Sequence, residues 1–276
     1  MINFIKRKIQ KLKQKRTFQE YGYDLKTFDI QGLGKVEYAQ WLHPFEGAKS
    51  ITNSNINFYR KLARPGGFIV DIGAHTGDTT VPMALAVGKE GSVLALEPNK
   101  YVYKILEKNA SLNKVHTNII PVCFAATSED GDFVFNYSDA SFNNGGFLST
   151  IHVKDHHHNY TLNVAGKNLQ KYLLNNYSKQ LDKLDLVKVD AEGYDKEILK
   201  TIPEILTRYK PNLMVECYKR LDANERHELF DIIHGHGYNL YYLENFEETG
   251  NKVLVEKKNM ADHKHFEMLA IHKDKH

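Results

Sequence analysis

The sequence predicts an α/β protein with a mostly parallel sheet and helices on both faces. From about residue 67, short apolar segments alternate with helical patterns, as they do where strands are joined by crossover helices. The last two apolar segments have no helical pattern between them, so they can pair antiparallel at one edge. The length of 276 residues suits one large α/β domain with a small appendage.

The elements follow from this alternation in chain order. Alternating and aromatic residues at 24–45 indicate a short hairpin, and Arg64-Pro65-Gly66-Gly67 is a turn signal that ends the first helix. We expect helices at 51–62, 79–87, 99–113, 169–174, 195–206 and 224–234. We expect strands at 68–71, 92–97, 118–125, 133–135, 184–190, 212–217, 238–243 and 266–272.

The first 16 residues carry seven Lys and Arg and no acidic residue. Isoleucine and leucine recur there at helical spacing, which predicts a basic amphipathic helix. Such a helix can contact an anionic membrane surface, or dock by its apolar stripe on the main domain. We divide the chain into an appendage at 1–60 and a main domain at 61–276, with an insert at about 138–166.

Composition narrows the class of protein. The formal net charge is +3, which is too low for a general nucleic-acid binder, so we expect no nucleic-acid partner. The chain has no run of 18 apolar residues and no apolar signal-peptide core. These absences favour a cytoplasmic protein.

A glycine-containing loop follows the first main strand. It reads Asp71-Ile72-Gly73-Ala74-His75-Thr76-Gly77-Asp78. Glycines there let the backbone approach a ligand, and the N–H groups of the next helix can bind an anion. The spacing D-x-G-x-x-x-G differs from G-x-G-x-x-G, which counts against a dinucleotide with its pyrophosphate. A purely structural tight turn is the alternative.

Two further strand ends complete the predicted cofactor site. Glu97 ends the second strand, where a carboxylate can accept hydrogen bonds from both ribose hydroxyls of a nucleoside. Pro98 stops that strand and Asn99 can cap the next helix. Ala125 and Ala126 end the third strand, and their small side chains leave room for an adenine ring. Glu97 as a simple cap and the alanines as a plain turn remain alternatives.

Three segments together resemble the FkbM family of methyltransferases: Val70–Gly77 (VDIGAHTG), Leu96–Asn99 (LEPN) and Val187–Gly193 (VKVDAEG). The K-x-D-x-E-G pattern of the third is the most specific. The similarity extends from about Gly67 to Cys217. His75 stands where the family often has Asn, and an imidazole can still donate a hydrogen bond to a carboxylate.

This resemblance implies a Rossmann-like class I fold with a seven-stranded sheet and S-adenosylmethionine as cofactor. It implies methyl transfer to oxygen, frequently on a sugar or a natural-product hydroxyl. By position it places the cofactor against the glycine loop and the second strand end. The residues concerned are Asp71, Gly73, His75, Gly77 and Glu97.

Acidic residues near the fourth and fifth strand ends are the catalytic candidates. Asp190 ends the fourth strand, where we expect it to act as a base or to anchor the acceptor. Glu192 and Glu216 are expected to support it, and Lys188 lies on the same strand face as Asp190. Asp190 as a helix cap and Lys188 in an internal ion pair are the alternatives. Asp190 and Glu216 holding a divalent cation is a further one.

The insert is polar and rich in histidine. His152 and His156 have a workable metal-ligand spacing, but the segment 152–158 shows no clear helical pattern, so a solvated loop near the acceptor is favoured. A histidine there could also be the base. The segment 141–147 is rich in Gly and Asn and could form a lid over the acceptor.

The predicted function is therefore S-adenosylmethionine-dependent O-methylation of a sugar or saccharide-containing acceptor. An NAD(P)-dependent oxidoreductase on a similar sheet is one alternative, and the absent G-x-G-x-x-G and the closing strand pair count against it. A non-catalytic module of polysaccharide assembly is another, which the intact acids at Asp71, Glu97 and Asp190 disfavour. Methylation of nitrogen also remains open.

Overall fold

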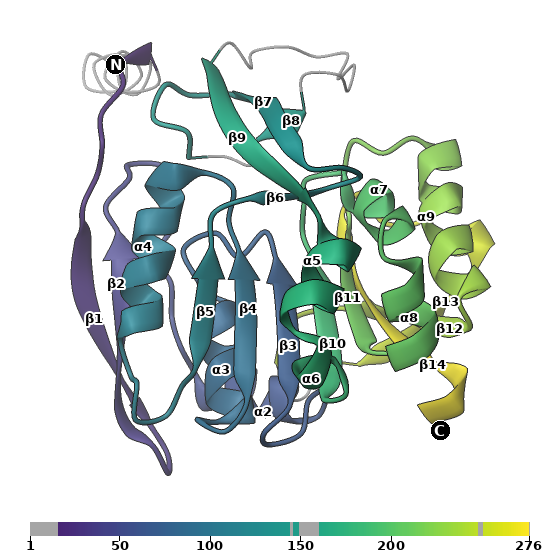
Figure 1. The fold of residues 1–276 in the computed structure, drawn as a ribbon, viewed down its shortest axis with the longest axis horizontal. Helices are drawn as coiled ribbons and strands as arrows, with labels where there is room; N and C mark the ends of the chain where they lie inside the picture. The colour runs from purple at the N-terminus through teal and green to yellow at the C-terminus, as the bar shows by residue number, and fades with distance from the viewer. Residues whose placement is uncertain (1–15, 144–145, 149–159, 248–250, 276) are drawn as a thin grey trace, which may run out of the picture.

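An eight-stranded sheet forms the centre of the protein in the computed structural model (Figure 1). The structure describes residues 16–143, 146–148, 160–247 and 251–275. The helix expected at residues 1–16 lies outside the described residues apart from Arg16, and so does the histidine-rich segment 152–158. The predicted α/β class is confirmed, since helices cover both faces of the sheet.

The strand order in the central sheet is β13-β12-β14-β11-β10-β3-β4-β5. The bounds are β3 Phe68–Ile72, β4 Ser92–Leu96, β5 Ile119–Val122, β10 Leu184–Val189, β11 Asn212–Cys217, β12 Tyr238–Leu243, β13 Lys252–Val255 and β14 Phe266–His272. The strands from β5 to β11 run parallel. Strand β14 is antiparallel to both β11 and β12. The antiparallel pairing of the last two predicted strands is present, but β14 is internal and β13 occupies the edge.

The alternation of side chains divides the strands between two cores. In β3, Phe68 and Val70 belong to one hydrophobic cluster and Ile69 to the other, because successive side chains of a strand point to opposite faces. The helices are α2 Asn53–Arg60, α3 Thr80–Val87, α4 Lys100–Ser111, α5 Leu169–Asn176, α6 Ser178–Leu181, α7 Asp195–Lys200, α8 Pro203–Tyr209 and α9 Ala223–Gly235. Short 3₁₀ turns lie at Lys257–Asn259 and Lys273–Lys275. Helices α2, α3 and α4 contribute to one core, and α5 to α9 to the other.

Two predicted elements are each divided in the structure. The strand expected at 118–125 becomes β5 and β6 (Ala125–Thr127), which belong to different sheets. The helix expected at 195–206 becomes α7 and α8. Pro203 is at the start of α8, where it fits because it lacks an N–H and would break a continuous helix.

A second, four-stranded sheet lies above the carboxyl ends of β3, β4 and β5 in Figure 1. It has the order β6-β9-β7-β8, with β7 at Gly131–Tyr137, β8 at Phe147–Leu148 and β9 at Tyr160–Asn168. A small apolar cluster that includes Phe135, Tyr137 and Leu162 holds it together. The described part of the predicted insert 138–166 contributes β8 and most of β9 to this sheet, and β6 and β7 come from the residues before the insert.

The N-terminal hairpin packs beside the sheet. Strands β1 (Tyr23–Ile30) and β2 (Gly34–Trp41) pair antiparallel, as the alternating sequence predicts. Trp41 of β2 packs in one cluster with Val102 and Ile105 of α4. The described part of the predicted appendage therefore shares its apolar contacts with the main domain.

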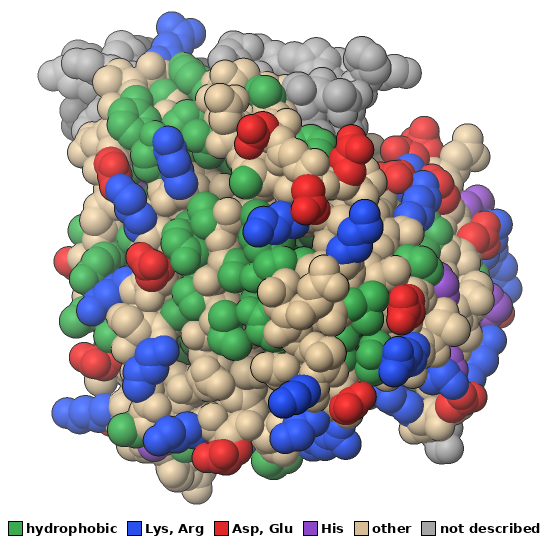
Figure 2. Space-filling view, in the orientation of Figure 1, with side chains coloured by type: hydrophobic (Ala, Val, Ile, Leu, Met, Phe, Trp, Pro, Cys, Tyr) green, Lys and Arg blue, Asp and Glu red, His purple; other side chains and the backbone are tan. Residues whose placement is uncertain are grey.

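The surface seen in Figure 2 carries basic and acidic side chains interspersed with apolar ones. This mixture agrees with the small net charge of +3. Among the described residues, the structure contains no helix long and apolar enough to cross a membrane.

Candidate active site

The loop after β3 brings three strand ends together. Gly73 has a φ of 75°, and a Cβ added there would lie 1.9 Å from the carbonyl oxygen of Asp190 at the end of β10. A side chain at residue 73 would therefore force the two strand ends apart. His75 has a φ of 48°, which is unusual for a residue with a side chain and is typical of functional loops.

Glu97 connects this loop to the end of β4. Its carboxylate accepts the backbone N–H of His75 at 3.0 Å and that of Asn99 at 2.8 Å. The side chain is buried, and this burial raises its pKa, although His75 and the two N–H groups oppose the shift. Asn99 also caps α4, since its side chain accepts the N–H of Tyr101. Glu97 is therefore held by backbone donors at a strand end, with lone pairs left to accept further hydrogen bonds.

A cavity of about 470 Å³ opens at these strand ends. This volume is in the range of small-molecule sites. Of the residues that the sequence predicts to bind cofactor, seven line it: Gly73, His75, Glu97, Pro98, Asn99, and Ala125 and Ala126 at the start of β6. Of the predicted catalytic residues, Lys188, Asp190 and Glu192 line it. The cavity thus unites the predicted cofactor site and most of the predicted catalytic residues.

Lys188 is a buried cation between two acids. Its Nζ lies 3.4 Å from Asp71 Oδ1 and 3.3 Å from Asp190 Oδ2. Burial disfavours its charge, but Asp190, Asp71 and other acidic groups together raise its pKa well above the ordinary value. Lys188 is therefore charged, and the ion pair that the sequence left as an alternative is present. One of its partners, Asp190, is open to the cavity, with 36% of its side chain exposed.

Asp71 does not line the cavity. It is fully buried under the loop, where Thr80 Oγ1 donates to Asp71 Oδ2 at 2.6 Å and Lys188 contacts the other oxygen. Its prediction as a cofactor ligand is corrected to a role inside the fold, because its charge is already matched by Lys188. Ala74 and Gly77, also predicted to bind cofactor, lie in the same loop without lining the cavity.

Glu216 also lies off the cavity wall. Its side chain is buried in β11, and its Oε1 atom lies 3.5 Å from His265 Nδ1. Burial first, and then repulsion from Asp190 and neighbouring acids, raises its pKa to about 10. The predicted direct support of Asp190 by Glu216 is corrected, since Glu216 does not line the cavity and its described ion pair is with His265.

The loop after β10 is organised by a residue that sequence reasoning missed as a site residue. Asp195, at the start of α7, accepts the N–H of Ala191 at 3.2 Å and that of Gly193 at 3.0 Å. Glu192 between them has a φ of 52° and lines the cavity. Burial and the charge of Asp190 raise the pKa of Asp195 to about 7. An acid six residues after the end of β10, at a helix start, is the signal that could have identified it.

The segment 139–143, at the start of the predicted insert, touches the cofactor loop. Asn99 Nδ2 donates to the carbonyl of Phe142 at 2.6 Å, and a ring nitrogen of His75 lies 3.4 Å from that of Asn143. Asp139 accepts the N–H groups of Ser141 and Asn143, which shapes the turn. Asn143 and Gly146 line the cavity, so the described part of the expected lid borders it.

Other cavity residues carried no local signal in the sequence. Lys49, in the segment after the N-terminal hairpin, pairs with Asp78 at 2.7 Å, and both line the cavity. Aromatic side chains come from several segments that are distant in the chain. They are Phe45, Phe124, Phe135, Tyr137, Tyr194 and Phe246.

These features fit S-adenosylmethionine. Glu97 can accept hydrogen bonds from ribose hydroxyls. Ala125 and Ala126, beside Phe124, form an apolar wall suited to an aromatic base. Lys49 and the start of α3 offer positive charge for a carboxylate, and Asp78 and Asp190 offer negative charge for the ammonium and sulfonium groups.

A Rossmann-like sheet with a reversed last strand, and a cavity at its carboxyl edge, define the class: a class I S-adenosylmethionine-dependent methyltransferase. The family model described as the methyltransferase FkbM domain matches residues 71–240, more than half of the chain. The protein therefore belongs to the FkbM family of methyltransferases, and S-adenosylmethionine is its cofactor. The predicted family, enzyme class and cofactor are confirmed.

Solved structures with a similar fold are distant in sequence. An FkbM methyltransferase from Methylobacillus flagellatus is 13% identical with a TM-score of 0.42, and the alignment covers 79% of this chain and 50% of that chain. An O-methyltransferase from Bacillus cereus in complex with SAH is 10% identical with a TM-score of 0.45, and the alignment covers 82% of this chain and 84% of that chain. Fibrillarin from Methanococcus jannaschii is 16% identical with a TM-score of 0.43, and the alignment covers 91% of this chain and 84% of that chain. No curated protein matches the chain.

Proposed function

We propose that the protein transfers a methyl group to a hydroxyl oxygen of a saccharide-containing acceptor, and that Asp190 is the base or anchor for that hydroxyl. The observation that carries the proposal is the Asp190 carboxylate at the cavity wall, open to the cavity and held by Lys188. A weakly acidic hydroxyl gains nucleophilicity when a positioned carboxylate accepts its proton.

The chain's own residues fix the position of this carboxylate. The backbone N–H of Asp190 donates to the carbonyl of Ile72 at 3.1 Å, which ties β10 to β3 beside the cofactor loop. The Lys188 ammonium donates a hydrogen bond to one oxygen of the Asp190 carboxylate. Bound S-adenosylmethionine supplies an electrophilic methyl group on sulfur. By holding the acceptor oxygen in line with that methyl group, the enzyme obtains much of its rate acceleration.

The rest of the wall favours a saccharide as the acceptor. Tyr137, Tyr194 and Phe246 present aromatic rings, and Glu192 and Asn143 present hydrogen-bonding groups. Sugars combine apolar C–H faces with rings of hydroxyls, so they match a wall of this mixed chemistry.

The test is turnover by an Asp190→Asn variant with a panel of nucleotide sugars, oligosaccharides and amines. We expect a saccharide to yield S-adenosylhomocysteine and an O-methylated product, identified by mass spectrometry and NMR. In the variant, kcat falls about 100-fold or more because the base is lost. Binding of S-adenosylhomocysteine and the melting temperature stay near those of the wild type.

Asp182→Asn, at an exposed position, is the matched control and keeps full turnover. Near-normal kcat in Asp190→Asn would remove Asp190 from the chemistry. Turnover with amines alone would replace the O-methylation proposal by N-methylation.

A further inference from the structure

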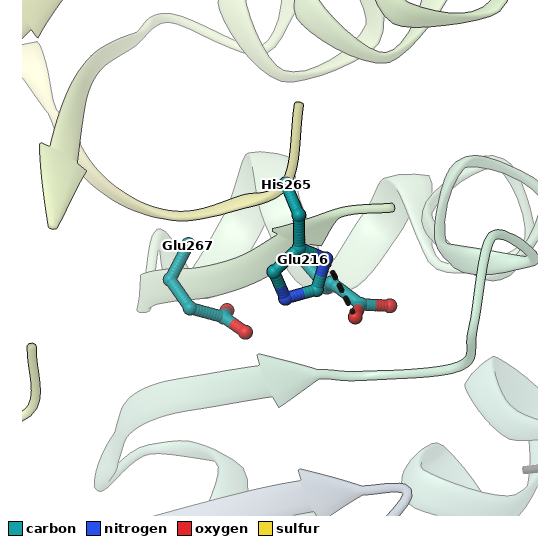
Figure 3. A group of neighbouring side chains, drawn as sticks. All are labelled: Glu216, His265 and Glu267. Atoms are coloured by element: carbon teal, nitrogen blue, oxygen red, sulfur yellow. Dashed lines mark ion pairs between the residues drawn. The ribbon is translucent and has the colours of Figure 1, made fainter. Parts of the chain in front are cut away.

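A second group of chemically reactive side chains lies beside the cavity. Glu216 of β11, with His265 and Glu267 at the start of β14, each offer one ligand atom, and these atoms lie within 4.8 Å of one another. Figure 3 shows the His265 ring between the two carboxylates, with its Nδ1 toward Glu216. Asp190, which the sequence paired with Glu216 as a possible cation site, is not in this group.

The strand register places two acids directly opposite one another. Glu216 pairs with Glu267 across the antiparallel β11–β14 ladder, so both side chains project from the same face of the sheet. Like charges at directly opposed positions destabilise a sheet. A cation bound between the two carboxylates would let both ionise without this repulsion, and His265 reaches only Glu216 among the described ion pairs.

Glu216 supplies an independent sign of a missing ligand. Its residue is 5% exposed, and its Oε2 atom is buried without a hydrogen-bond partner among the described residues. A buried carboxylate oxygen without a partner costs free energy that a bound ligand recovers. His265 is half exposed, so an ion can enter from solvent on its side.

We propose that Glu216, His265 and Glu267 bind a first-row divalent transition-metal cation such as Zn²⁺ or Mn²⁺. Two carboxylates and one imidazole form a mixed oxygen and nitrogen set, which suits these ions better than the all-oxygen sphere that Mg²⁺ prefers. Ligands at about 2.1 Å in tetrahedral geometry lie about 3.4 Å apart.

The cation would act on the acceptor side of the cavity. Glu216 interacts electrostatically with Asp190 and Glu192, which line the cavity wall. A positive charge at Glu216 would offset part of the negative charge collected there. Three protein ligands also leave open positions on the ion. The site does not depend on the proposed acceptor, and metal binding is measurable without turnover.

The experiment is calorimetric titration of the full-length, EDTA-treated protein with ZnCl₂, with MnCl₂ and MgCl₂ as parallel arms. The run His156-His157-His158 can bind zinc by itself. All proteins therefore carry Gln at those three positions. In this background we expect one Zn²⁺ per chain, with Mn²⁺ also bound and Mg²⁺ bound at least tenfold more weakly.

The variants Glu267→Gln and His265→Gln test the ligands, and His263→Gln is the matched control. His263 lies two residues from His265, is exposed, and stacks on Tyr242. We expect zinc affinity to fall at least tenfold in the first two variants and to be unchanged in the third. Melting temperatures measured in EDTA show that the variants fold. Glu267→Gln should melt near the wild-type temperature, because the amide keeps the size and hydrogen-bonding capacity of the carboxyl group.

Three results would overturn the proposal. The first is that the background protein binds no zinc. The second is that Glu267→Gln binds zinc as tightly as the background protein does. The third is that His263→Gln and His265→Gln lose the same amount of zinc affinity. Magnesium binding as tight as zinc binding would contradict the proposed ion class. Titration of the same proteins with S-adenosylhomocysteine separates failure of the metal site from failure of the methyltransferase proposal.

Discussion

Four carboxylates lie in or next to the loops at the carboxyl ends of β3, β4 and β10, and each has a local partner. Asp71 and Asp190 share the Lys188 ammonium, and Asp195 accepts two backbone N–H groups. Glu97 likewise accepts two N–H groups. These partners divide the acids by role: Asp71 and Asp195 hold the loops, and Glu97 and Asp190 face the cavity.

We expect Glu97 to contribute more to cofactor affinity than any other single residue. We expect Glu97→Ala to weaken S-adenosylhomocysteine binding roughly 30-fold or more, because hydrogen bonds to a charged group contribute about 1.5–3 kcal/mol each. Calorimetric titration measures this. Glu90→Ala, an exposed carboxylate in the turn before β4, serves as control. Unchanged affinity in Glu97→Ala would remove Glu97 from the cofactor site.

Asp195 gives the protein a predictable dependence on pH. Burial and Asp190 raise its pKa from 3.8 to about 7 in the folded state. Between these values the folded protein holds a proton that the unfolded chain releases, so the free energy of unfolding falls as pH rises. The slope from this group is at most about 1.4 kcal/mol per pH unit, and it ends above pH 7.

Urea unfolding of the wild type and Asp195→Asn at several pH values between 4 and 8 measures this slope. Asn cannot titrate, so we expect the variant's stability to decline less steeply with pH than that of the wild type. Parallel profiles for the two proteins would show that Asp195 does not titrate in this range.

Individual site residues were predictable where they end a strand. Gly73, His75, Glu97 and Asp190 follow apolar segments directly, and the carboxyl ends of parallel strands meet at one edge of a sheet. Lys49 and the aromatic residues of the cavity come from segments whose position depends on tertiary packing. Asp71 was misplaced because strand position alone does not show that a buried lysine already occupies its carboxylate.

At the scale of elements, two asparagines attach α4 to the N-terminal hairpin. The Asn109 amide accepts the N–H of Ala39 and donates to its carbonyl, and Asn113 does the same with Glu37. The two amides thus pair with β2 much as a neighbouring strand would. Asn109 also donates to the carbonyl of Thr76 at 2.7 Å in the cofactor loop, so hairpin, helix and loop are joined at one side chain.

We expect Asn109→Ala to lower the free energy of unfolding by about 2–4 kcal/mol, because it leaves several buried backbone groups unpaired. Asn113→Gly removes the equivalent exposed pair without backbone strain at its φ of 54°, and should cost less than about 1 kcal/mol. Urea unfolding compares them. Equal losses in the two variants would contradict the special role of Asn109.

Strong local patterns predicted most elements, and non-local pairing explains the differences. The second sheet divides the strand expected at 118–125, because β6 pairs with β9 from beyond the insert. Strand β13 was missed because it is short and mostly exposed, so it lacks the apolar pattern of its neighbours. Pro203 could have predicted the break between α7 and α8, because proline interrupts a continuous helix.

At the scale of the whole molecule, the cavity is closed by parts that lie outside the Rossmann-like sheet. Phe45 and Lys49 approach from the N-terminal segment, and Phe135 and Tyr137 from the second sheet. The strand ends and loops of the central sheet provide most of the predicted cofactor residues, and β6 of the second sheet provides Ala125 and Ala126. The N-terminal segment and the second sheet lie outside the sequence motifs, and they supply much of the cavity wall that an acceptor would meet.

The measurement that tests this account most directly is calorimetric titration of the purified protein with S-adenosylhomocysteine, with NAD⁺ and NADP⁺ as parallel controls. The account predicts micromolar binding of S-adenosylhomocysteine alone, at one molecule per chain. Binding of a nicotinamide dinucleotide without S-adenosylhomocysteine would contradict it and would reinstate the oxidoreductase alternative.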